Sequence, residues 1–101
     1  MSEMQYDKVV EKEEIITKPP PKYKVMFFND DFTPFEFVVT ILVKFFNKNT
    51  DEAAALATKV HEQGSATVGA YTREIAETKT NQTLYVSQFN GFPLKVEVIK
   101  E

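Results

Sequence analysis

The stretch Tyr23–Phe37 constrains this chain most, because it encodes a strand, a tight corner and a helix start in succession. Val25–Phe28 is an uninterrupted apolar run, which is typical of a central strand that is buried on both faces. Asn29, Asp30 and Asp31 end that run with side chains that favour turns, since they bond to nearby backbone groups. We therefore expect a cluster of polar acceptors at the corner between a buried strand and a helix.

The sequence predicts the start of a helix directly after this corner. Thr33 suits the N-cap, Pro34 suits the first helical position, and Glu36 follows the cap by three residues. This spacing predicts a capping box, in which a hydroxyl and a carboxylate each accept a hydrogen bond from a backbone N–H. The helix is expected to reach Lys48 and to bury one stripe at helical spacing. That stripe consists of Val38, Ile41, Leu42, Phe45 and Phe46.

A second helix is predicted from another capping-box pattern, in which Asn49 precedes Glu52 by three residues. We expect this helix to run to about Gln63, because Gly64 readily adopts the left-handed conformation that ends many helices. Small side chains on its inner face would allow close packing against a neighbouring helix. The stripe expected to be buried consists of Ala53, Leu56, Ala57 and Val60.

The rest of the chain predicts two further strands around a third helix. Ser65–Tyr71 alternates in polarity as a strand does, and Thr72 is expected to cap the helix that follows. Within that helix, Leu84–Phe89 is apolar enough to contact the core, and Leu94–Ile99 alternates as the last strand. With a first strand at residues 22–28, the order is β-α-α-β-α-β. This order predicts an α+β fold, a three-stranded sheet with helices on one face.

Composition bounds the domain organisation and excludes several functions. The 101 residues suffice for one domain. Residues 1–21 can bury little and end in three prolines, so we expect a flexible extension before a core domain at 22–101. A net charge of −3 argues against nucleic-acid binding, and the absence of cysteine excludes disulfides and is consistent with a reducing, cytoplasmic setting. No apolar run is long enough for a membrane helix or a signal peptide.

The polar residues alone leave several kinds of chemistry open. His61 is the only histidine, and catalysis would also need a nucleophile and an orienting partner beside it. Asp30 and Asp31 are candidates for a general acid and base, although turn formation by itself explains such residues at a corner. With Asn29 and His61 they also form a weak candidate metal site, which lacks the glycine-containing pattern of a calcium loop.

The corner and several positions downstream of it resemble one known family. Residues 29–38 read Asn-Asp-Asp-Phe-Thr-Pro-Phe-Glu-Phe-Val. They are similar to the block Asn-Asp-Asp-aromatic-Thr-Pro-x-Glu-Phe-Val of the ClpS adaptor family. The resemblance runs from about Lys22 to the C-terminus. The further matching positions are Val60, His61, Gly64, Gly69, Ala76–Lys79, Pro93 and Leu94.

This resemblance implies a non-catalytic adaptor for N-degrons, the N-terminal residues that mark a protein for degradation. Members of the family bind Phe, Tyr, Trp or Leu at a free N-terminus. They pass the substrate to the AAA+ unfoldase ClpA or ClpC, which feeds the ClpP protease. The resemblance implies no cofactor, metal, nucleic acid or membrane as a partner. We expect the chain to be a cytoplasmic monomer whose residues 1–21 serve delivery.

The resemblance also assigns roles to individual positions. Asn29 and His61 would accept hydrogen bonds from the α-ammonium group of the substrate. Asp31 would assist through a water, and Asp30 would shape the corner and its field. The side-chain pocket would consist of Thr33, Phe35, Ala57, Val60 and Leu94. The surface that docks the unfoldase would include Glu74 and Lys79.

Two pocket positions depart from the family pattern. Phe35 stands where the family usually has methionine, and Ala57 stands where well-known members have it, so one change adds bulk and the other removes it. We expect a rebuilt pocket in which Phe35 fills space left at Ala57. Two alternatives stay open: an interaction module of the same fold without an amine pocket, and a small acid–base or metal enzyme using Asp30, Asp31 and His61.

Overall fold

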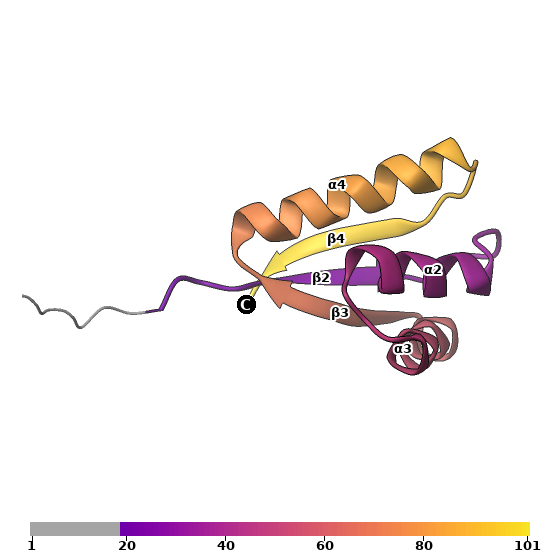
Figure 1. Ribbon diagram of the computed structural model, residues 1–101, viewed down its shortest axis with the longest axis horizontal. Helices are drawn as coiled ribbons and strands as arrows, with labels where there is room; N and C mark the ends of the chain where they lie inside the picture. The colour runs from indigo at the N-terminus through magenta and orange to yellow at the C-terminus, as the bar shows by residue number, and fades with distance from the viewer. Residues whose placement is uncertain (1–18) are drawn as a thin grey trace, which may run out of the picture.

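The computed structural model describes residues 19–101, and within them three strands and three helices follow the predicted order (Figure 1). The extension predicted at residues 1–21 lies outside the described residues except for its last three. No helix in the described part of the chain is long and apolar enough to cross a membrane. The elements are β2 (Tyr23–Phe28), α2 (Phe35–Phe45), α3 (Thr50–Gln63), β3 (Ser65–Tyr71), α4 (Arg73–Phe89) and β4 (Lys95–Lys100).

The sheet is antiparallel with the strand order β3-β2-β4, so the predicted central position of the first strand is confirmed. Val25 and Phe27 point to the helical side and are fully buried. Phe27 lies opposite Ala66 on one neighbouring strand and Val96 on the other. The alternate residues Met26 and Phe28 are only half-buried, because the helices cover one face of the sheet (Figure 1).

The core lies between this face and the inner sides of α2 and α3. Most of the predicted stripe of α2 is buried, and the Phe46 ring packs edge-on against the Phe27 ring with 5.4 Å between centroids. Ala53, Ala57 and Val60 bury the inner side of α3 as predicted, although Leu56 is only partly buried. Each large apolar side chain removed from water in this way contributes roughly 1.5–3 kcal/mol.

Both predicted ends of α3 are confirmed. The Asn49 side chain accepts a hydrogen bond from the Glu52 backbone N–H at 2.8 Å, and the Glu52 carboxylate accepts one from the Asn49 N–H at 3.0 Å. Gly64 ends the helix with φ of 90°, a left-handed conformation that costs a residue with a Cβ more than it costs glycine. Its N–H donates to the Val60 carbonyl at 2.9 Å. These contacts fix the last turn of α3, which carries His61.

The predicted capping box at the start of α2 is wrong. The helix begins at Phe35, with Pro34 as an N-cap that has no side-chain hydrogen bond. The Thr33 backbone N–H, which Glu36 would accept in a capping box, donates instead to the Asp30 carboxylate at 2.7 Å. The Thr33 hydroxyl also donates to that carboxylate at 2.8 Å, so Asp30 takes the place that the capping box gives to Glu36.

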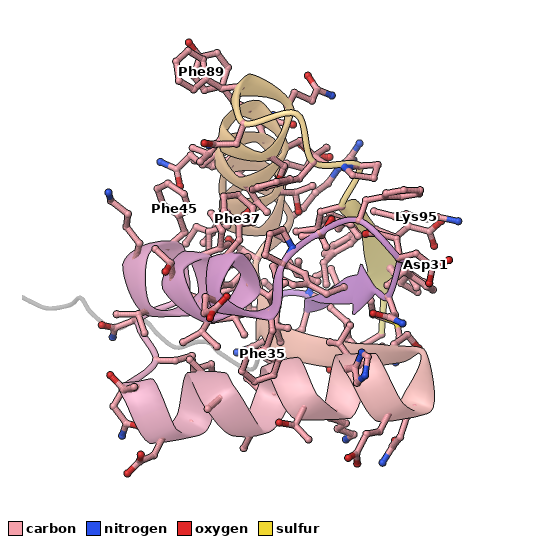
Figure 2. The ribbon with its side chains drawn as sticks, turned by 90° about the vertical axis from the view of Figure 1, so that its right-hand side faces the viewer. Asp31, Phe35, Phe37, Phe45, Phe89 and Lys95 are labelled. Atoms are coloured by element: carbon pink, nitrogen blue, oxygen red, sulfur yellow. The ribbon has the colours of Figure 1, made fainter. Side chains whose placement is uncertain are left out.

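The predicted contact between Leu84–Phe89 and the core is confirmed for only part of the segment, where Val86 packs against the core. The Tyr85 and Phe89 side chains are 72% and 82% exposed, and Figure 2 shows Phe89 projecting from the end of α4. The stripe of α4 that faces the sheet instead contains Thr83 and Ser87, which are buried. Their hydroxyls donate to carbonyls one turn earlier, at 2.9 and 2.8 Å, so they need no external partner.

Candidate functional site

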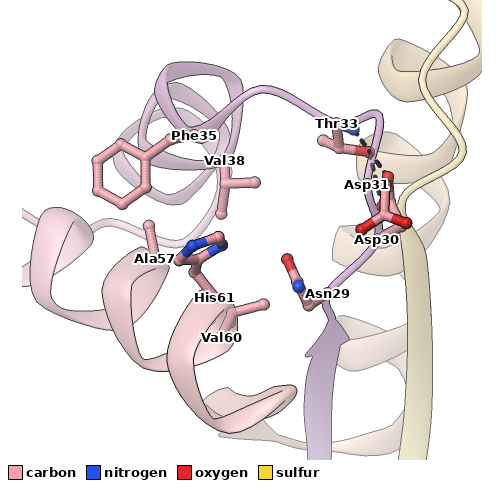
Figure 3. Close-up of a pocket in the computed structure, with 9 residues that line it drawn as sticks. All are labelled: Asn29, Asp30, Asp31, Thr33, Phe35, Val38, Ala57, Val60 and His61. Carbon is pink, nitrogen blue, oxygen red and sulfur yellow. Dashed lines mark hydrogen bonds between the residues drawn. The ribbon is translucent and has the colours of Figure 1, made fainter.

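The corner between β2 and α2 is organised by one aspartate. Asp30 Oδ1 accepts hydrogen bonds from the backbone N–H groups of Phe32 and Thr33, at 2.8 and 2.7 Å, and its Oδ2 accepts the Thr33 hydroxyl. Burial alone would raise the pKa of Asp30, but these hydrogen bonds favour its ionised form and hold the pKa below the ordinary value. Asp30 is therefore committed to the backbone of the corner (Figure 3).

The fold brings this corner against the C-terminal end of α3. The Asn29 backbone N–H donates to the Gly64 carbonyl at 2.9 Å, and the preceding residue Phe28 pairs with Ser65 in the sheet. Asn29 at the end of β2 and His61 in the last turn of α3 thereby line the same cavity, with their side chains directed into it (Figure 3). Two positions far apart in the sequence are held together by backbone hydrogen bonds.

The cavity has a volume of about 250 Å³ and two chemically different walls. The polar wall consists of Asn29, Asp30, Asp31, Thr33 and His61. The apolar wall consists of Phe35, Val38, Ala57 and Val60. Among residues 19–101, no protein group is hydrogen-bonded to the side chains of Asn29, Asp31 or His61. These three side chains are free to bind a ligand that enters beside an apolar wall.

Eight of the nine predicted binding and pocket residues line the cavity. The exception is Leu94, which is buried in the core and does not line the cavity. Val38, by contrast, lines the cavity but was predicted only as a core residue. It lies three residues after Phe35 and therefore on the same face of α2, a spacing that should have indicated its place in the pocket.

The arrangement suits a cationic hydrogen-bond donor joined to an apolar group. Asn29 supplies a carbonyl oxygen, His61 supplies a ring nitrogen, and Asp31 adds an exposed carboxylate. In the described part of the chain, no group of three or more His, Cys, Asp or Glu side chains is placed to hold a metal ion. The cavity thus offers acceptors and negative charge for an ammonium group.

Comparison with known proteins decides the family. Residues 18–97 match the family described as "ATP-dependent Clp protease adaptor protein ClpS". The chain belongs to the ClpS family. This match spans the corner, the cavity and the three helices of residues 19–101, so all the residues discussed as a site lie within the shared region.

Individual members of the ClpS family are similar over nearly the whole chain. A Treponema denticola protein, "ATP-dependent Clp protease adapter protein ClpS", is 44% identical over 100 residues, which cover 96% of this chain and 99% of the relative. One from Paraburkholderia xenovorans is 46% identical over 87 residues, covering 86% and 84%. Among solved structures, Agrobacterium tumefaciens ClpS2 bound to L-phenylalaninamide has a TM-score of 0.79 and 38% identity, covering 82% of this chain and 100% of its own.

The two positions that the ClpS resemblance assigns to unfoldase docking differ in their surroundings. Glu74 is exposed in the first turn of α4. Lys79 is half-buried, and its ammonium group donates to the Phe45 carbonyl at the end of α2, with 2.6 Å between Nζ and the oxygen. It also lies 5.7 Å from the Phe46 ring centroid and 5.3 Å from that of Tyr71. Lys79 therefore joins α4 to α2 within the domain.

Proposed function

We propose that this chain is an adaptor that binds proteins beginning with a bulky hydrophobic residue, Phe, Tyr, Trp or Leu, through the free α-amino group and the first side chain. The observation that carries the proposal is the two-walled cavity, in which unpaired acceptors face the same space as an apolar wall. Asn29 and His61 accept hydrogen bonds from the α-ammonium group. Asp31 contributes negative charge, and Asp30 keeps the corner in shape.

The chemistry of a protein N-terminus fits these groups. An α-amino group has a pKa near ~7.7–8.0, so it is mostly cationic at neutral pH and offers three N–H donors. Hydrogen bonds that involve a charged group contribute about 1.5–3 kcal/mol each. Burial of a large apolar side chain contributes roughly as much again. Binding therefore requires both an unblocked amine and a large apolar first residue.

The comparisons support the same ligand class. The ligand of the Agrobacterium tumefaciens ClpS2 structure, L-phenylalaninamide, has a free α-amine, a phenyl side chain and an amide in place of a carboxylate. It therefore resembles the first residue of a polypeptide. The relatives are named as adaptors of the ATP-dependent Clp protease. In our proposal the chain, a cytoplasmic monomer, catalyses nothing itself and passes its substrate to ClpA or ClpC for degradation by ClpP.

The proposal is tested by fluorescence anisotropy with the full chain and three labelled peptides. One peptide begins with Phe, the second with the same Phe acetylated, and the third with Ser. We expect strong binding of the first alone, because acetylation removes the charge and serine leaves the apolar wall uncovered. An interaction module without an amine pocket would bind all three alike. Such a result, or peptide hydrolysis, would contradict the proposal.

A further inference from the structure

The ring of Phe35 supplies most of the apolar surface that a ligand in the cavity can newly cover. Phe35 is 46% exposed, whereas Val38 is 7% exposed and Ala57 and Val60 are each 3% exposed. The side chains of the three aliphatic residues are already buried in the core. A first side chain that enters the cavity therefore gains apolar contact chiefly against a phenyl ring.

This ring is also without an aromatic partner. The aromatic pairs within residues 19–101 join Phe27 to Phe46, Phe37 to Phe92, and Phe46 to Tyr71, and none includes Phe35. Figure 3 shows the Phe35 ring above Ala57, at the edge of the cavity opposite Asn29. The methyl group of Ala57 cannot make the edge-to-face contacts that a second ring would make. The first side chain of a substrate is the group placed to make them.

Aromatic pairs gain affinity beyond the area that they bury. The negative face and positive edge of each ring attract one another in offset or edge-to-face contact, and an aliphatic side chain lacks this term. The measured range for such pairs corresponds to a preference of about 2- to 10-fold at equal burial. We propose that Phe35 makes this pocket select aromatic first residues over leucine.

This inference rests on the proposed function and names its preferred substrates, proteins that begin with Phe, Tyr or Trp. It is tested by competition anisotropy with the full chain and peptides that differ only in their first residue. The residues compared are Phe, Leu and cyclohexylalanine, which has nearly the shape of phenylalanine but no π-system. The wild type, Phe35→Leu and Phe35→Tyr are compared, with Phe89→Leu as the control because Phe89 is exposed and lies outside the cavity.

We expect the wild type and Phe89→Leu to prefer Phe over both Leu and cyclohexylalanine by about 2- to 10-fold. Phe35→Tyr should retain the preference, because it retains a ring. Phe35→Leu should still bind the Leu peptide but lose the preference. Equal affinities in the wild type, or the same ratio in Phe35→Leu, would overturn the inference and leave the proposed function intact. Failure of every free-amine peptide to bind the wild type would overturn both.

Discussion

The two ends of α2 use polar groups beside aromatic rings in opposite ways. At the C-terminal end, the Lys79 ammonium group satisfies the Phe45 carbonyl and lies over the Phe46 and Tyr71 rings. Burial raises the pKa of the Tyr71 phenol above its ordinary value. At the N-terminal end, Asn29 and the other free acceptors face a cavity instead. One end is bonded within the protein, and the other is left open to a ligand.

Stability and binding therefore depend on different ends of α2. Leaving acceptors open is tolerable because Asn29 and His61 are exposed to water when the cavity is empty. The half-buried ammonium of Lys79 needs its partner, because a charge away from water is costly unless it is hydrogen-bonded. Substitutions at the open end should therefore change binding, and substitutions at the bonded end should change the free energy of unfolding.

The largest expected effect is on binding at the open end. Asn29→Ala and His61→Ala should each weaken binding of a peptide with a free N-terminal Phe by roughly 10- to 150-fold, since each removes a hydrogen bond to a charged group. Anisotropy titration measures this effect. The free energy of unfolding should change by less than about 0.5 kcal/mol, because both side chains are exposed. Large destabilisation of both variants would instead make these residues structural.

The next largest effect is expected at the bonded end. Lys79→Met should lower the free energy of unfolding by about 1–3 kcal/mol, because the Phe45 carbonyl loses a charged donor. Urea denaturation measures the loss. Glu74→Gln is the matched control on the same helix, and its exposed side chain should change stability by less than about 0.5 kcal/mol.

If Lys79→Met and Glu74→Gln are equally stable, the hydrogen bond from Lys79 contributes nothing to the free energy of unfolding. The proposed contrast between the two ends of α2 would then be wrong. If Lys79→Met is destabilised while peptide binding is kept, a loss of unfoldase docking in that variant would not identify Lys79 as a direct contact. Glu74, which has no such role within the domain, would then be the better probe of docking.

A smaller effect, with a defined pH dependence, is expected at the corner. The pKa of Asp30 is lowered in the folded protein, so its contribution to stability is present above the unfolded pKa of about 3.9 and is lost as pH falls through the folded value. Asp30→Asn should lower the free energy of unfolding at pH 7 by about 1 kcal/mol, since a neutral acceptor is weaker.

Urea denaturation at pH 7 and at pH 3 checks this prediction. The gap in stability between wild type and Asp30→Asn should narrow at the lower pH, because the unfolded chain takes up a proton on Asp30 before the folded protein does. A gap that stays constant would mean that the charge of Asp30 does not stabilise the corner. Asp31→Asn is a matched control at the adjacent position, where the exposed carboxylate makes no hydrogen bond within residues 19–101.

The helix caps and stops could be predicted from the sequence, because each of them depends on contacts among residues a few positions apart. The Asn49 and Glu52 pair and the Gly64 stop depend only on neighbouring backbone, and they were confirmed. The capping box at Thr33 failed because Asp30, three residues earlier, accepts the Thr33 backbone N–H that Glu36 would have accepted. Periodicity alone could not distinguish these two local solutions, since both satisfy orphan backbone N–H groups.

Prediction of the site depended more on the resemblance to the ClpS family than on the pattern of residue types in the sequence. Residue types alone could not show that Asn29 and His61 converge, because that requires the hydrogen bond between the Asn29 N–H and Gly64. The internal role of Lys79 also escaped prediction, because its carbonyl partner is 34 positions away in the sequence. Leu94 was placed in the pocket by the resemblance, whereas the fold buries it in the core.

The smallest expected effect concerns Phe89, which resembles Phe35 in being an exposed phenylalanine but lies on α4 away from the cavity. Phe89→Ser should change the free energy of unfolding by less than about 0.5 kcal/mol, because the ring is 82% exposed and has little burial to lose. Peptide affinity should also stay the same. If Phe89→Ser weakened peptide binding as much as Phe35→Leu does, general hydrophobicity of the surface would explain binding, and the cavity would lose its distinction from the rest of the molecule.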